Sequence, residues 1–171
     1  VVLIIGESAR ADHFHINGYN RQTTPLLENI PNLISYNNVQ SCANWTHIAI
    51  PCMLTRATPQ NLDPTHQEAS IITILRKLGF YTLWIGNQGG YFSLEESFLK
   101  IAKESHDVII PSRFLYKGSE LDESLLPYFD KALQQHKGNN FIVLHTMGSH
   151  YHYERRYNEQ FREFKPICPN N

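Results

Sequence analysis

Continuous apolar runs alternate along the chain with segments in which apolar residues recur every three or four positions. The runs at 1–5, 80–85 and 141–144 are rich in Val, Ile, Leu and Phe, which is typical of strands buried on both faces of a sheet. Two shorter or weaker runs, at 33–39 and 108–110, predict further strands.

Helical periodicity marks the segments between these runs. An apolar stripe over 71–78 stops at Gly79, a residue type that commonly follows a helix, and a second stripe covers 123–136. A third helix is expected to begin at a Ser93 cap and to run to about residue 104. Strands separated by helices of this length form parallel sheets covered on both faces. The pattern predicts an α/β fold, a three-layer sandwich with a mainly parallel sheet.

Composition and charge favour one globular domain over residues 1–171. Hydrophobic residues make up 42% of the chain and charged residues 18%, which suits a buried core and differs from a disordered chain. The 15 basic and 16 acidic residues give a net charge of −1, which argues against a nucleic-acid binder. No apolar run in the sequence is long enough to span a membrane. Because the chain opens inside an apolar run without an initiator Met, we expect a segment of a longer protein and an incomplete sandwich.

Polar side chains follow three of the predicted strands. Glu7 follows the first run, Asn87 and Gln88 follow the second long run, and His145 and His150 follow the last. In a parallel sheet the carboxyl ends of the strands meet at one edge, where ligands bind. A carboxylate, a pair of amides and two imidazoles gathered at that edge are typical of a metal or phosphate site.

Glu7 is open to two interpretations. A carboxylate that follows a buried strand costs several kcal/mol unless it is paired or binds a metal. A salt bridge to Arg10 would satisfy this requirement, and so would a metal ion. The sequence leaves both alternatives open.

Thr46 lies where a helix is expected to begin, between residues 46 and 51. The free N–H groups at a helix start favour phosphate, so a hydroxyl there could take part in phosphate chemistry. A plain N-cap is the commoner role for a Thr in that place. Asn44-Trp45-Thr46 is also an N-glycosylation sequon.

The three cysteines leave an odd count. Cys42 and Cys52 are close enough in sequence to close a loop as a disulfide, which would indicate an oxidising compartment. A pair of buried free thiols is the alternative, and the spacing does not decide between the two. Cys168 lies near the last residue, and its partner could lie beyond Asn171.

Three ordered blocks of the sequence resemble the catalytic domain of phosphoethanolamine transferases, members of the alkaline phosphatase and sulfatase superfamily. The blocks are residues 1–13 with 17–19 and 23–25, residues 41–53, and residues 143–150 followed by 156–157. The resemblance covers nearly the whole chain and corresponds to the N-terminal half of that domain. It implies an alkaline phosphatase-like fold.

The resemblance also assigns roles to residues that the pattern left open. Thr46 would be the nucleophile and, together with Glu7, a ligand of Zn²⁺. His150 would lie near the transferred phosphate or a second zinc ion, with Asn87 in the same substrate region. His145 would orient a ligand from behind the site.

Two further expectations follow from the resemblance. Cys42 and Cys52 would form a disulfide that braces the nucleophile segment, and Cys168 would pair with a cysteine beyond the present end. The family's later Ser-Asp-His-Gly block, which supplies further zinc ligands, does not occur in residues 1–171. We therefore expect this chain to be inactive by itself.

The implied reaction is zinc-dependent transfer of phosphoethanolamine from phosphatidylethanolamine to lipid A, a lipopolysaccharide core sugar or another envelope glycan. It would pass through a phosphothreonine-type intermediate, because zinc lowers the pKa of a bound hydroxyl. The implied location is the bacterial inner membrane, reached through segments that this chain lacks, with the catalytic domain in the periplasm. A glycerophosphate transferase or phosphodiesterase of the same superfamily and a non-catalytic binding fragment are the alternatives.

Overall fold

A four-stranded parallel sheet lies at the centre of the fold. The computed structural model describes residues 1–63, 67–88, 97–111 and 121–166. In the sheet the strands follow the order β1-β4-β2-β3, and every neighbouring pair is parallel. The two central strands are the long apolar runs of the sequence, and they are almost entirely buried. The strands are β1 (Val2–Ile5), β2 (Tyr81–Gly86), β3 (Asp107–Ile109) and β4 (Asn140–His145).

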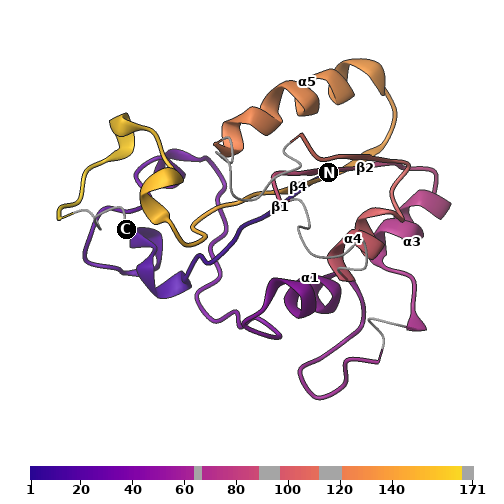
Figure 1. Cartoon of the computed structure of the whole chain (residues 1–171), viewed down its shortest axis with the longest axis horizontal. Helices are drawn as coiled ribbons and strands as arrows, with labels where there is room; N and C mark the ends of the chain where they lie inside the picture. Colours follow the sequence, from indigo (N-terminus) through magenta and orange to yellow (C-terminus); the bar gives the residue numbers. More distant parts are fainter. Residues whose placement is uncertain (64–66, 89–96, 112–120, 167–171) are drawn as a thin grey trace.

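Helices cover both faces of this sheet (Figure 1). α5 (Leu126–Gln135) lies over one face, whereas α1 (Thr46–Leu54), α3 (Ile71–Lys77) and α4 (Ser97–Ala102) lie over the other. This arrangement confirms the predicted α/β fold with helices on both sides of a parallel sheet. Short 3₁₀ turns occupy connecting segments: η1 (Ala11–His13), η2 (His15–Asn17), η3 (Leu27–Asn29), η4 (Asp122–Leu125), η5 (Tyr153–Arg155) and η6 (Glu159–Phe161).

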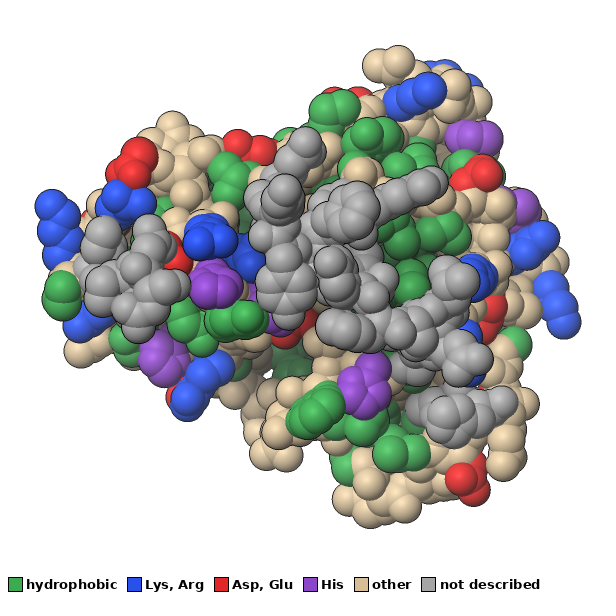
Figure 2. Space-filling model, viewed as in Figure 1, with side chains coloured by type: hydrophobic (Ala, Val, Ile, Leu, Met, Phe, Trp, Pro, Cys, Tyr) green, Lys and Arg blue, Asp and Glu red, His purple; other side chains and the backbone are tan. Residues whose placement is uncertain are grey.

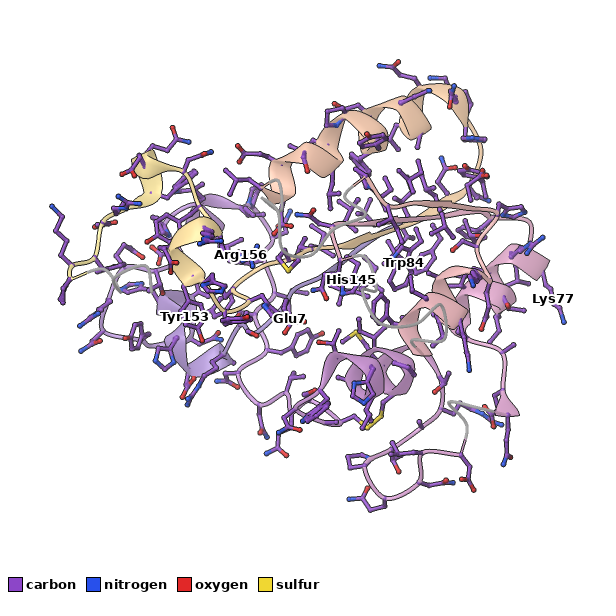
Figure 3. All side chains as sticks on the ribbon, in the orientation of Figure 1. Glu7, Lys77, Trp84, His145, Tyr153 and Arg156 are labelled. Carbon is purple, nitrogen blue, oxygen red and sulfur yellow. A yellow bond between two sulfur atoms is a disulfide. The ribbon has the colours of Figure 1, made fainter. Side chains whose placement is uncertain are left out.

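Each face of the sheet carries its own hydrophobic core, because successive side chains of a strand point to opposite faces. Leu83 and Ile85 of β2 pack with Leu125 of η4 and Ala132 of α5. Trp84, between them in the sequence, packs on the other face with apolar residues of α1, α3 and α4. Figure 3 shows Trp84 in the dense region between the sheet and these helices.

The prediction of a strand at 33–39 is wrong. These residues are exposed, and they pair with no strand in the part of the chain that the structure describes. Asn32, just before the segment, adopts a left-handed φ of 60°, and Asn37-Asn38 interrupts the apolar run. Asparagine favours turns over ladder pairing, so the apolar residues around it remain in an irregular surface segment.

The other predicted elements are confirmed with shifted ends, but the first strand is not buried on both faces, because β1 lies at the edge of the sheet and Ile4 is 65% exposed. The helix predicted at 123–136 divides into η4 and α5, because Pro127 suits the first turn of a helix but has no N–H to bond to an earlier turn. The helix expected to begin between residues 46 and 51 begins at Thr46. α4 is described from Ser97 onward, and the predicted Ser93 cap lies outside the described residues.

Charges of both signs are interspersed on the surface. Figure 2 shows Lys and Arg side chains around the margin of one face of the molecule with Asp and Glu among them. In the ranges that the structure describes, no helix combines the length and the apolar content that crossing a membrane requires.

Candidate active site

The carboxyl ends of β1, β2 and β4 bring the predicted site residues to one edge of the sheet. Ile5 of β1 and Gly86 of β2 both pair with His145, the last residue of β4. Glu7 and residues 146–150 follow these strand ends directly. Figure 3 shows Glu7 and His145 at this end of the sheet. The polar side chains therefore gather at the edge where ligands bind in such sheets.

Thr46 and Glu7 are in direct contact although 39 positions separate them in the sequence. Thr46 is the first residue of α1, and its Oγ1 donates a 2.7 Å hydrogen bond to Oε2 of Glu7. The N-cap position belongs to Trp45, so the N-cap interpretation of Thr46 is wrong. The hydroxyl instead lies at the positive end of the helix dipole, beside a carboxylate.

The salt-bridge interpretation of Glu7 is also wrong, because Arg10 pairs with Asp12 at 2.6 Å. Instead of a salt bridge to Arg10, Glu7 receives hydrogen bonds from uncharged donors. Oγ of Ser8 donates to its Oε1 at 2.8 Å, and Nε2 of Gln88 donates to its Oε2 at 3.3 Å. With the bond from the α1 hydroxyl, both carboxylate oxygens have partners.

These contacts determine the charge of Glu7. Burial acts to raise the pKa of Glu7, but hydrogen bonds from Thr46, Ser8 and Gln88 and the nearby His150 outweigh it, so the pKa lies below its usual value. Ser8 adopts a φ of 53°, a left-handed conformation that is uncommon outside glycine. This backbone turn directly after β1 accompanies the contact between the Ser8 hydroxyl and the neighbouring carboxylate.

The turn after β4 (residues 146–149, the β4 turn) packs against the backbone of Glu7. The N–H of Ser149 donates to the carbonyl of Glu7 at 2.9 Å. Gly148 adopts a φ of 50°, and a Cβ built there would lie only 2.7 Å from the backbone nitrogen of Glu7. Any larger residue at this position would push the two segments apart.

His150 follows the β4 turn at the rim of the site. It is partly buried, and its charge acts on the carboxyl of Glu7. Arg156 fastens this segment, because its Nε donates to the carbonyl of His150 at 3.3 Å and its Nη2 donates to the carbonyl of Tyr151 at 3.2 Å. Figure 3 shows Arg156 and Glu7 at the same end of the molecule.

His145 lies behind the site, in the core. Its side chain is fully buried between the rings of Trp84 and Phe98, whose centroids are 5.5 Å and 5.1 Å away. Burial lowers the pKa of His145 to about 4, although the carboxylates of Glu7 and Asp122 act to raise it. Neither ring nitrogen has a hydrogen-bond partner among the described residues. His145 is therefore a neutral imidazole at neutral pH.

Asn87 faces Asp122 rather than Glu7, since its Nδ2 donates to Oδ1 of Asp122 at 2.8 Å. Gln88 belongs to the pair of amides predicted after the second long run, whereas the sequence did not predict Asp122 as a site residue. Gln88 is buried, and its Nε2 also donates to the carbonyl of Thr146 at 2.7 Å. Asp122 lies before a helix with no motif around it, so no local signal marked it.

Cys42 and Cys52 form a disulfide, with their Cα atoms 6.2 Å apart. Cys42 lies in the loop before α1 and Cys52 lies within that helix, so the bond closes the segment that contains Thr46. The free-thiol interpretation is wrong. Cys168 lies outside the described residues.

Oxygen donors that suit a metal are adjacent in this site. The carboxylate of Glu7 and the hydroxyl of Thr46 are 2.7 Å apart, and carboxylate oxygens bind zinc alongside imidazole and water. Within the ranges described above, no group of three or more His, Cys, Asp or Glu side chains is arranged to hold a metal ion. Because zinc sites use three or four protein ligands, these two residues fit one part of such a site.

Comparisons with known proteins agree with this geometry. Phosphoethanolamine transferase EptA of Escherichia coli O157:H7 is 32% identical over 175 residues, which cover 99% of this chain and 31% of that protein. The solved soluble domain of lipooligosaccharide phosphoethanolamine transferase A from Neisseria meningitidis aligns with a TM-score of 0.86 and 30% identity, over 99% of this chain and 51% of that one. The C-terminal periplasmic domain of EcEptC from Escherichia coli, solved in complex with Zn, aligns with a TM-score of 0.83 and 28% identity, over 93% and 46% of the two chains.

The chain thus spans about a third of the curated relative's length and about half of the solved domains. These similarities confirm the resemblance to phosphoethanolamine transferase catalytic domains and the alkaline phosphatase-like fold. The model of the family described as Sulfatase matches residues 1–171. Because this match covers every residue of the sequence, the chain belongs to the sulfatase family.

Proposed function

We propose that the protein carrying this chain transfers phosphoethanolamine from phosphatidylethanolamine to lipid A, a lipopolysaccharide core sugar or another envelope glycan. The observation that carries the proposal is the hydrogen bond from Thr46 to Glu7 at the carboxyl edge of the sheet. The relatives support it, because their names specify phosphoethanolamine transfer and, in one case, a lipooligosaccharide.

Thr46 is the nucleophile in this proposal. Its Oγ1 attacks the phosphorus of the donor's phosphodiester, the bond from phosphorus to the diacylglycerol oxygen breaks, and diacylglycerol leaves with the threonine proton. An acceptor hydroxyl then attacks the same phosphorus, the bond to Thr46 breaks, and Thr46 regains a proton from the acceptor. Glu7 orients the hydroxyl, because its Oε2 accepts the hydroxyl hydrogen and leaves the lone pairs of the oxygen available for attack.

Zn²⁺ is the proposed cofactor. Glu7 and Thr46 would hold it together with ligands from outside the described residues. When bound, the zinc ion would lower the pKa of the threonine hydroxyl. The adjacency of the two oxygens and the zinc complex of the related EcEptC domain support this assignment.

The remaining site residues have supporting roles in the proposal. His150 interacts with the phosphorus oxygens in this proposal, because it follows the β4 turn that packs against Glu7. Asn87 belongs to the substrate region at the end of β2. His145 supports the site only by packing, as a neutral imidazole held between the rings of Trp84 and Phe98.

The proposed location of the domain is the periplasmic side of the bacterial inner membrane. The Cys42–Cys52 disulfide supports an oxidising compartment. The related EcEptC domain is described as periplasmic, which supports the same location.

Replacing the nucleophile tests the proposal. In the full-length polypeptide that carries this chain, Thr46→Ala is expected to reduce transfer by at least ~10³-fold, because no other hydroxyl replaces its oxygen. Thr46→Ser keeps a hydroxyl and is the matched control, expected to retain transfer within about tenfold of wild type. The assay follows a labelled phosphatidylethanolamine donor with lipid A as acceptor. Intact mass is expected to detect a phosphoethanolamine adduct on the wild type and none on Thr46→Ala.

Several outcomes would overturn the proposal. Wild-type transfer by a folded Thr46→Ala protein would exclude Thr46 as the nucleophile. Use of phosphatidylglycerol in place of phosphatidylethanolamine would identify a glycerophosphate transferase, and release of free phosphoethanolamine would identify a phosphodiesterase. Donor binding without turnover would indicate a non-catalytic binding protein.

A further inference from the structure

Asp122 ties the carboxyl ends of β2 and β4 together. Its Oδ1 accepts hydrogen bonds from Nδ2 of Asn87 at 2.8 Å and from the backbone N–H of Met147 at 2.7 Å. Its Oδ2 accepts a bond from the backbone N–H of Gly148 at 2.8 Å. Asp122 itself is the first residue of η4, which leads into α5. One carboxylate therefore fixes two strand ends from a third element.

The β4 turn that Asp122 holds is the segment that packs on Glu7. The Ser149 N–H binds the Glu7 carbonyl at 2.9 Å, and the space beside Gly148 is too small for a Cβ. Because the two backbones are this close, a displacement of the turn would displace Glu7 as well. Oε2 of Glu7 in turn receives the Thr46 hydroxyl. A continuous series of contacts therefore leads from Asp122 through the turn and Glu7 to Thr46.

A carboxylate suits this position better than any other side chain of its size. Three donors converge on two oxygens, and an ionised carboxylate accepts at both. Asparagine has the same shape, but its NH₂ group would face one of the backbone N–H groups of the β4 turn in either orientation of the amide. One N–H of the turn would then lack an acceptor, and the turn would be free to move.

We propose that Asp122 is a positioning residue, which fixes the β4 turn so that Glu7 keeps the Thr46 hydroxyl aligned with the phosphorus. This inference rests on the proposed function, because it explains the Asp122 contacts by the need to align Thr46 for transfer. Asp122 acts through the turn and through Glu7, and it takes no part in the bond changes.

The test compares Asp122→Asn with Asp130→Asn in the full-length polypeptide. Asp130 is an exposed residue of α5, so its substitution makes the same charge change away from the turn. For Asp122→Asn we expect kcat to fall at least ~10-fold while the KM for phosphatidylethanolamine changes less than about twofold. We also expect the amide hydrogens of Met147 and Gly148 to exchange at least ~10-fold faster. Asp130→Asn should leave all three quantities unchanged.

A kcat of Asp122→Asn within about twofold of wild type, or a loss expressed only as a higher KM, would overturn the inference. If this variant does not fold, exchange in the wild type decides. The Met147 and Gly148 amides must then exchange at least ~100-fold slower than the exposed amides of residues 33–39, and equal rates would overturn the inference. Absence of transfer by the wild type would defeat the proposed function instead, and the exchange rates would still report on the Asp122 contacts.

Discussion

Glu7 is a partly buried, ionised carboxylate just after the edge strand β1, and the donors around it stabilise its charge. Thr46, Ser8 and Gln88 all donate hydrogen bonds to its two oxygens. These bonds stabilise the charged form more than burial disfavours it, so the pKa of Glu7 is lowered. The side chain therefore carries a negative charge at neutral pH, which a carboxylate ligand of zinc requires.

Removing that charge tests the proposed ligand role. Glu7→Gln keeps the shape of the side chain but replaces one ligand oxygen with an NH₂ group, so we expect zinc affinity to fall at least ~10-fold. Zinc bound to the full-length polypeptide would be measured by elemental analysis after dialysis against a competing chelator. Glu163→Gln changes an exposed glutamate and should keep the wild-type zinc content. Equal zinc contents in both variants would contradict the assignment of Glu7.

At the scale of elements, α1 is positioned by contacts at its start and within its length. The hydroxyl of Thr46 binds Glu7 at the first residue, and Cys52 is joined to Cys42 in the preceding loop. Ile50 and Leu54 pack into the core beneath the sheet. The helix therefore reaches its place through tertiary contacts, and the disulfide restricts the loop that leads to the nucleophile.

The stability of this element depends on the oxidation state of the two cysteines. Cross-linking residues ten positions apart removes chain entropy from the unfolded state worth about 3 kcal/mol. We expect the double substitution Cys42→Ala, Cys52→Ala to lower the free energy of unfolding by about that amount, measured by urea denaturation without reductant. Wild-type protein in reductant should lose a similar amount, whereas the same reductant should destabilise the double variant by less. Equal unfolding free energies for the oxidised wild type and the variant would rule out this stabilisation.

At the scale of the whole molecule, two cores enclose the sheet, and one of them contains a titratable group. His145 is fully buried on the same face of β4 as Val143, beneath Trp84 and Phe98. Burial lowers its pKa from 6.5 to about 4. Between pH 6.5 and about 4, His145 is therefore neutral in the folded protein but protonated in the unfolded chain.

This difference predicts how folding stability depends on pH. Because the folded pKa of His145 is lower than the unfolded value, its contribution to stability is complete above pH 6.5 and declines as the pH falls toward 4. Between pH 7 and pH 5 this one group should lower the free energy of unfolding by about 2 kcal/mol. In the His145→Phe variant, Phe fills a similar volume without titrating. The free energy of unfolding of this variant should therefore change less between pH 7 and pH 5 than that of the wild type. Denaturation at both pH values checks this, and parallel changes in the two proteins would contradict it.

The central part of the fold was accessible from the sequence. The apolar runs that became β2 and β4 are long and buried on both faces, so their periodicity was a strong signal. The run at 33–39 misled because apolar composition does not ensure a pairing partner. The strand-end rule located Glu7, and the resemblance added the role of Thr46. Asp122 was missed because it acts on residues about 25 or more positions away, with no local motif.

Local sequence patterns predict the alternation of strands and helices and the edge of the sheet at which the polar residues gather. Both follow from local properties, namely the period of apolar positions and the polarity of parallel strands. The contacts of the folded chain were needed to show that Thr46 donates to Glu7, that Arg10 does not, and that Asp122 joins two strand ends. A hydrogen bond forms only when donor and acceptor lie within about 3 Å, and folding brings together residues that the sequence separates.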